Sequence, residues 1–255
     1  MRIAIRGSEL IGTKLANRLR EQGHEVVAAS GSSFENSTVE ALVHTFAGVR
    51  VVVDVANTPS FKENVTLESF ETPDASILAA EAAAGVEHHV ALSMVGIERQ
   101  PENDYFREKK AQESLIRASH IPYTIIRSTH FFESAGCIAK SGAVGDHVRL
   151  SPALFQPISS DDVADVIAEI STGVPLNGTV EIAGPERVPI DEFVGRYLQA
   201  TKDTRTVVPD VHARFFGAEL NDLFLTPGDS PRIGSTRFED WLNDAVFQTN
   251  EHSKT

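Results

Sequence analysis

The sequence predicts an α/β fold built on a doubly wound parallel sheet, with a smaller, loop-rich lobe in the C-terminal half. As far as Arg127, apolar strand-like runs alternate with segments of helical periodicity, a pattern typical of a parallel sheet with helices on both faces. The chain also opens with a short strand, a glycine-containing turn and an amphipathic helix. That arrangement is the first unit of a dinucleotide-binding fold, so the sheet is expected to be of the Rossmann type.

The predicted elements of the first half follow from periodicity. Ile11, Leu15 and Leu19 fall on one face of the first helix, and Gly23 suits its C-cap. The run at 49–56 is almost continuously apolar, as expected of a strand covered on both faces. In chain order the predicted elements are strand 2–5, helix 10–22, strand 24–30, helix 38–47, strand 49–56, helix 68–84, strand 89–93, helix 105–118 and strand 121–126.

After Arg127 the alternation gives way to shorter, less regular elements. We interpret residues 1–247 as one dinucleotide-binding domain whose substrate lobe comes mainly from 129–247, and 248–255 as a disordered polar tail. The predicted elements here are helix 129–139, strands 147–150 and 155–158, helix 162–171, strand 179–182, helix 190–200, strand 204–208, and short helices at 215–224 and 238–242.

Composition excludes several classes of protein. A chain of 255 residues with 41% apolar residues can bury a sizeable core. Its net charge of −13 argues against a nucleic-acid-binding surface, and the absence of an apolar run of ~18 residues argues against a membrane span. The single Cys137, expected to be buried, excludes an intrachain disulfide and fits a reducing cytoplasm, and no Cys/His cluster has zinc spacing. The sequence leaves the oligomeric state open, a homodimer included.

The turn after the first strand is the candidate pyrophosphate site, because the N-terminus of a helix offers free N–H groups and a positive dipole. Gly7 and Gly12 keep two glycines of the usual pattern, but Arg6 and Glu9 stand where a G-x-x-G-x-x-G spacing would place others. Arg6 is expected to pair with a phosphate or with Glu9, or else the two residues disable the loop. The predicted cofactor-binding residues of this turn are Gly7, Ser8, Leu10, Ile11 and Gly12.

Two further segments are predicted to contact the cofactor. Ser30 ends the second strand, where an acidic residue would bind a ribose 2′-hydroxyl and repel a 2′-phosphate. With Ser30, Ser32 and Ser33 there instead, NADP is slightly favoured over NAD. Asn57 follows the third strand at its carboxyl end, where ligands of open α/β sheets lie.

A candidate catalytic group comes from Tyr105 and Lys109, which form a Y-x-x-x-K on one face of a predicted helix. A phenol has a pKa near ~10, and a neighbouring ammonium favours its ionised form. Tyr105 can then act as acid or base toward a carbonyl or carbinol oxygen during hydride transfer. Ser93, at the end of the preceding strand, can hydrogen-bond and polarise the same oxygen. Lys109 can also reach the ribose hydroxyls. The alternative is a surface Tyr–Lys pair.

Together these motifs resemble the short-chain dehydrogenase/reductase superfamily, and over about residues 1–242 its atypical, NmrA-like branch of NAD(P)H-binding proteins. The matching stretches are 7–12, 23–28, 53–57, 92–93, 105–109, 122–127 with 131–133, Ile158 with 162–164, 177–179 with 184–186, and 238–242. The resemblance implies that Asn57, His130 and Phe131 border the nicotinamide and a small-molecule substrate. His130 packing in the core is the favoured alternative.

We therefore expect a cytoplasmic NAD(P)H-dependent oxidoreductase that acts on a small carbonyl or quinone-like substrate. Two rival interpretations stay open. Some NmrA-like relatives sense redox state or bind protein partners without turnover, and a Rossmann protein with a disabled loop would bind no dinucleotide at all. Epimerase or isomerase chemistry uses the same three side chains and is not excluded.

Overall fold

The computed structural model describes residues 1–7, 9–29, 37–56, 68–99 and 104–244. Two compact units share the chain. Unit 1 is Met1–Arg127 with Val163–Val180, and unit 2 is Ser128–Asp162 with Glu181–Thr255. The predicted division into a domain at 1–247 and a tail stays a prediction, and the tail at 248–255 lies outside the described residues.

Unit 1 contains the central sheet. Strand β1 pairs in parallel with β2 on one side and β3 on the other, and β3 pairs in parallel with β4. The full strand order is β12-β9-β5-β4-β3-β1-β2; β9 runs on into unit 2, where its last residues pair in parallel with β12. The strands are β1 (Arg2–Gly7), β2 (Glu25–Ala29), β3 (Val51–Val55), β4 (His88–Met94), β5 (Tyr123–Ser128), β9 (Gly178–Ala183) and β12 (Arg232–Ile233).

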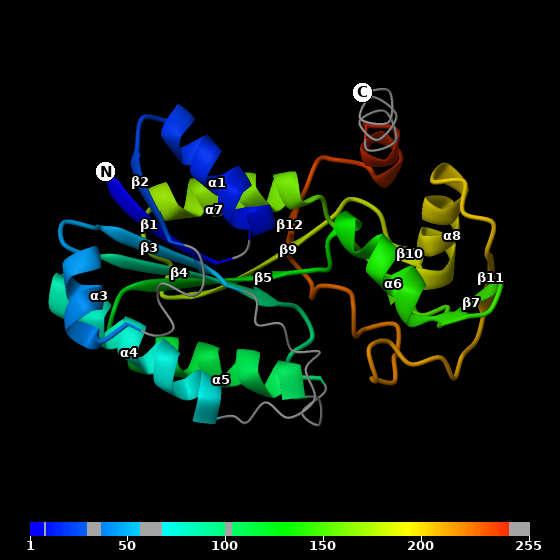
Figure 1. Cartoon of the computed structure of the whole chain (residues 1–255), viewed down its shortest axis with the longest axis horizontal. Coiled ribbons are helices and arrows are strands. Elements are labelled where there is room, and N and C mark those ends of the chain that lie inside the picture. Colours follow the sequence, from blue (N-terminus) through cyan, green and yellow to red (C-terminus); the bar gives the residue numbers. More distant parts are fainter. Residues whose placement is uncertain (8, 30–36, 57–67, 100–103, 245–255) are drawn as a thin grey trace. The chain divides into compact units, whose positions relative to one another are not determined.

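Helices cover both faces of this sheet, which confirms the predicted doubly wound α/β architecture. Figure 1 shows α1 and α7 on one face and α3, α4 and α5 on the other. An ion pair between Arg18 and Asp165 joins α1 to α7. The helices are α1 (Glu9–Glu21), α3 (Val39–Thr45), α4 (Glu68–Ala84), α5 (Asp104–Ala118) and α7 (Ser160–Thr172).

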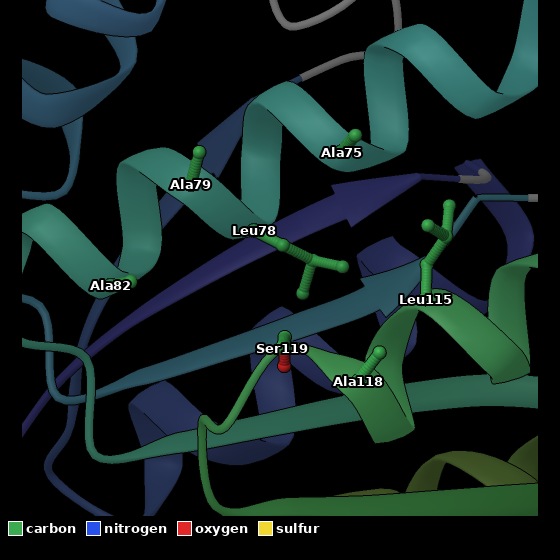
Figure 2. A pocket seen from close by; sticks show the side chains of 7 residues that line it. All are labelled: Ala75, Leu78, Ala79, Ala82, Leu115, Ala118 and Ser119. Carbon is green, nitrogen blue, oxygen red and sulfur yellow. The ribbon is translucent and has the colours of Figure 1, made fainter.

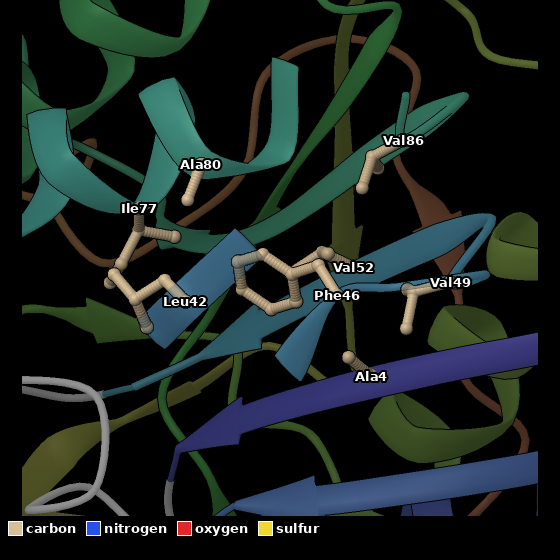
Figure 3. Close-up of a cluster of buried hydrophobic side chains, with 8 residues drawn as sticks. All are labelled: Ala4, Leu42, Phe46, Val49, Val52, Ile77, Ala80 and Val86. Atoms are coloured by element: carbon tan, nitrogen blue, oxygen red, sulfur yellow. The ribbon is translucent and has the colours of Figure 1, made fainter. Parts of the chain in front are cut away.

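The core of unit 1 follows the two predicted periodicities. Ile11, Leu15 and Leu19 are all buried under α1, as their spacing predicts. On the other face, the fully buried Phe46 packs between the sheet and α4 (Figure 3). The cluster around it consists of Ala4, Leu42, Phe46, Val49, Val52, Ile77, Ala80 and Val86.

Unit 2 is held together by aromatic side chains. Phe193 lies 5.1 Å from Phe155 and 4.3 Å from Phe238, measured between ring centroids, and Phe132 lies 5.1 Å from Phe238. Trp241 stacks on Phe238 at 5.7 Å. The elements are η1 (Phe132–Ser134), α6 (Ala135–Ser141), β6 (Ala143–Val144), β7 (His147–Leu150), β8 (Leu154–Phe155), β10 (Val188–Pro189), α8 (Ile190–Ala200), β11 (Thr206–Pro209) and a helix at 238–244.

Three predictions for this half are wrong. The stretch 215–224 is turns, because Phe216 and Gly217 both have positive φ and let Phe215 pair with Ala218 in a tight reversal. The helix predicted at 129–139 starts only at Ala135, because the backbone at 131 bridges to Ile158.

The third wrong prediction is that Cys137 is buried, because the structure places it exposed on α6.

Among the helices of the described residues, none is long and apolar enough to cross a membrane.

Candidate functional site

The carboxyl ends of β1 and β3 approach each other closely at Gly7. This residue has a φ of +125°, and a Cβ built on it would lie 2.1 Å from the backbone nitrogen of Ala56. Gly12, in the first turn of α1, would place a Cβ 3.3 Å from the carbonyl oxygen of Gly7. Strand, turn and helix are therefore packed too tightly here for larger side chains, as a pyrophosphate-binding turn requires.

The other predicted cofactor residues divide into two groups. Leu10 is 39% exposed at the start of α1, whereas the side chain of Ile11 is buried in the core. The remaining predicted cofactor contacts are outside the described residues: Ser8, Ser30, Ser32, Ser33 and Asn57.

Arg6 has a buried structural environment. Its guanidinium lies 2.7 Å from a carboxylate oxygen of Asp54, directly opposite on β3, and 2.7 Å from one of Asp74 on α4. Because α4 covers the face of the sheet opposite to α1, the Arg6 side chain extends away from the helix that would receive a pyrophosphate. The sequence predicts that Arg6 pairs with a phosphate or with Glu9, whereas in the structure its guanidinium pairs with the carboxylates of Asp54 and Asp74.

The pKa values of the two aspartates, Asp54 and Asp74, are shifted in opposite directions. Burial opposes ionisation of Asp54, but Arg6, His89 and Lys109 together lower its pKa. Burial raises the pKa of Asp74, and repulsion from Asp54 raises it further. Asp54 therefore carries the stable negative charge of the cluster, and it also accepts a hydrogen bond of 2.9 Å from the Ala56 backbone nitrogen.

Lys109, a predicted catalytic residue, is buried at this edge of the sheet. Its Nζ donates to the carbonyl oxygen of Ala56 at 3.1 Å, to that of Leu92 at 3.5 Å, and to Oε1 of Gln112 at 3.2 Å. Gln112 in turn donates to Asp54 at 3.2 Å. Burial lowers the pKa of Lys109, while Asp54 and Asp74 oppose that shift. The cation is thus connected to Arg6 through a buried polar chain.

Ser93 and Tyr105, the other two predicted catalytic residues, both precede this lysine in the chain. Ser93 follows Leu92 on β4 and donates its hydroxyl proton to Oε1 of Glu113 at 2.7 Å. Tyr105 lies in the first turn of α5, one helical turn before Lys109, and its side chain is not among those described. The structure therefore brings Ser93 and Lys109 to one edge of the sheet, beside the helix that bears Tyr105.

The predicted substrate residues His130 and Phe131 belong to unit 2. The His130 ring lies 5.1 Å from that of Phe215 and 5.7 Å from that of Phe155, and burial lowers its pKa to about 4. These ring contacts fit a packing role, and the substrate role of His130 stays a prediction. Phe131 is half-buried, and its backbone bridges to Ile158.

A separate pocket of about 270 Å³ lies between α4 and α5 (Figure 2). Its walls are almost wholly alanine and leucine, and the hydroxyl of Ser119 already donates to the carbonyl oxygen of Ile116 at 2.8 Å. No charged side chain lines it, so we do not place chemistry there. The lining residues are Ala75, Leu78, Ala79, Ala82, Leu115, Ala118 and Ser119.

Sequence reasoning missed the partners of the predicted residues. Asp54 interrupts an otherwise apolar buried strand, and a charge at such a position was a usable signal. Glu113 follows Lys109 by four residues, so it shares the same helix face. Arg127 lies on β5, is 9% exposed and donates to Glu113. No comparable feature of the sequence indicates this contact.

Comparison with known proteins supports a dinucleotide-binding fold for this chain. A family model described as NAD(P)H-binding matches residues 10–172. The chain is 29% identical over 197 residues to a (4-alkanoyl-5-oxo-2,5-dihydrofuran-3-yl)methyl phosphate reductase of Streptomyces griseus, a match that covers 75% of this chain and 64% of that protein.

Two solved structures show the same fold across nearly the whole chain. MoeE5 in complex with UDP-glucuronic acid and NAD matches with a TM-score of 0.75 at 16% identity, covering 99% of this chain and 100% of that one. An NADPH-dependent quinone oxidoreductase from Escherichia coli matches with a TM-score of 0.62 at 15% identity, covering 95% and 99%.

Proposed function

The chain belongs to the NAD(P)H-binding family, and on this premise we propose that it is an NAD(P)H-dependent oxidoreductase of the short-chain dehydrogenase/reductase type. The proposed reaction moves a hydride between the nicotinamide and the reacting carbon of a small carbonyl or quinone-like substrate. The reductase name of the Streptomyces relative supports the reaction class. The residues at 30–33 favour NADP slightly over NAD.

The observation that carries the proposal is the position of Lys109. Its ammonium bonds the carbonyl of Ala56, the residue on which Gly7 packs, and the carbonyl of Leu92, the residue before Ser93. Lys109 is thus bonded both to a residue that packs against the proposed cofactor turn and to the residue that precedes Ser93. A surface Tyr–Lys pair would not have its lysine 6% exposed.

The residues of the β1–α1 turn fit a dinucleotide. Gly7 leaves no room for a Cβ, and α1 begins two residues later, so the positive end of the helix dipole stands at the carboxyl end of β1. Arg6 does not compete with the ligand, because its side chain is held by Asp54 and Asp74. When bound, NAD(P)H would supply the hydride in reduction, and NAD(P)+ would accept it in oxidation.

The protein's own groups would handle the proton and the substrate oxygen. Tyr105 would give a proton to the oxygen in reduction and take it back in oxidation. The positive charge of Lys109, one helical turn away, would favour the ionised phenol. Ser93 would hydrogen-bond the same oxygen in its hydroxyl form and hold it in place.

A second candidate is a non-catalytic NAD(P)H-binding sensor, and one observation favours it. Lys109 donates to three protein acceptors and Ser93 donates to Glu113, so neither group needs a ligand to satisfy its hydrogen bonds. In a sensor, binding would change affinity for a partner without turnover.

The turnover rate of the variant Tyr105→Phe distinguishes the oxidoreductase from the sensor. We expect NADPH oxidation with quinone and aldehyde acceptors to fall by about 10²–10⁴-fold, the usual contribution of a general acid, with cofactor affinity nearly unchanged. Tyr123→Phe, on β5 of the same unit, is the matched control and should keep its rate. Equal rates for Tyr105→Phe and the wild type would refute the proposed role. Binding without turnover across the acceptors would favour the sensor.

A further inference from the structure

The carboxylate of Glu113, beside the proposed site, accepts four hydrogen bonds. It lies on α5 one turn after Lys109, and its side chain is 1% exposed. Oε1 accepts from Ser93 at 2.7 Å and from Nε of Arg127 at 2.9 Å, and Oε2 accepts from Arg127 at 2.7 Å and from Arg117 at 2.8 Å.

These contacts determine which way the Ser93 hydrogen bond runs. Burial opposes ionisation of Glu113, but the bonds from Arg127, Ser93 and Arg117 lower the pKa of its carboxyl, so it is ionised at neutral pH. An ionised carboxylate can only accept hydrogen bonds, so Ser93 must donate. A serine hydroxyl has one proton and two lone pairs. Once its proton is given to Glu113, Ser93 can offer a ligand only lone pairs.

We propose that Glu113 is a positioning residue that holds Ser93 as a hydrogen-bond acceptor, so that the site binds the hydroxyl form of its substrate in preference to the carbonyl form. The inference rests on the proposed function. A carbonyl oxygen has no proton to donate to Ser93, whereas an alcohol or hydroquinone has one. Ser93 therefore recognises the reduced partner of the redox pair and contributes little to polarising the oxidised one.

The test uses the full chain with NADPH, 1,4-benzoquinone as substrate and hydroquinone as inhibitor. The quinone takes a hydride from NADPH and a proton from the enzyme or solvent, and leaves as hydroquinone. In Glu113→Gln the amide can donate to Ser93 and free its proton for a carbonyl. We expect the hydroquinone Ki to rise by about tenfold relative to the benzoquinone KM, the value of one good hydrogen bond.

Two other variants sharpen the experiment. Glu98→Gln is the matched control, because Glu98 bonds the same Arg127 at 2.8 Å but is exposed. It should leave the ratio of Ki to KM unchanged. Ser93→Ala covers the case in which Glu113→Gln fails to fold, and it should weaken hydroquinone more than benzoquinone. A Ser93→Ala variant that mainly weakens benzoquinone would overturn the inference.

Different outcomes test the proposed oxidoreductase function and the role of Glu113. Wild-type turnover with an unchanged ratio in Glu113→Gln would overturn the role of Glu113 alone. No turnover by the wild type would remove the proposed function and the inference with it. A double-mutant cycle of Ser93→Ala and Glu113→Gln by urea unfolding should be non-additive even without turnover. Additive shifts would show that the bond is not made in solution, which also overturns the inference.

Discussion

Replacement of Arg6 by methionine tests whether this residue is structural. The guanidinium is 8% exposed and lies 2.7 Å from each of two carboxylates, whose side chains are 4% exposed in Asp54 and 16% in Asp74. Removing one member of a buried ion cluster leaves an uncompensated charge and costs about 3–5 kcal/mol. We therefore expect Arg6→Met to lower the free energy of unfolding by that amount at pH 7, measured by urea denaturation.

The effect should depend on pH in a defined direction. Without Arg6, the two buried carboxylates raise each other's pKa, so the folded variant binds protons more readily than its unfolded chain. The destabilisation is then present above those raised pKa values and shrinks as the pH falls through them. Arg50→Met is the control, because Arg50 and Glu87 are both more than half exposed and an ion pair in solvent contributes little to stability. A loss no larger than the control, or one independent of pH, would refute the reasoning.

Three further predictions concern the turn, a buried imidazole and the aromatic core. Gly7→Ala should abolish NADPH binding or destabilise the fold in thermal-shift assays, because its Cβ would overlap the Ala56 backbone at 2.1 Å. Burial lowers the pKa of His88 to about 4, so the unfolded chain binds its proton first. This residue should therefore cost about 3 kcal/mol of stability as the pH falls from 6.5 to 4, a slope that His88→Gln should flatten in urea titrations. Phe193→Ala should cost about 3–5 kcal/mol by the same assay, because the ring is fully buried among Phe155, Phe132 and Phe238.

Most of the fold of unit 1 could be predicted because its signals are local. The 3.6-residue spacing of Ile11, Leu15 and Leu19 and the apolar run at 49–56 each identify an element without knowledge of its neighbours. Prediction was poorer in unit 2, where backbone pairing between distant residues decides the structure. Because Phe131 bridges to Ile158, the helix predicted from residue 129 begins only at Ala135. The positive φ values at Phe216 and Gly217 produce a turn where a helix was predicted at 215–224.

The candidate site shows the same division. The four-residue spacing of Tyr105 and Lys109 is visible in the sequence, and Gln112 bonds Lys109 within the same helix. The other partners of Lys109, and the partner of Ser93, come from different elements. Asp54 and Glu113 are close to them only because β3, β4 and α5 pack together. Alternation along β1 does place Arg6 on the face of Ala4, toward α4, so its direction was predictable in principle. The identity of its two partners was not.

Binding of NADPH and NADH to the unmodified protein tests the central claim most directly. A thermal-shift titration is sufficient, because a ligand at ~100 times its dissociation constant stabilises the folded state by about 2.7 kcal/mol. We predict a clear rise in Tm with at least one of the two, larger for NADPH. No rise with either at millimolar concentration would contradict the account. It would mean that the β1–α1 turn of this chain does not receive a dinucleotide.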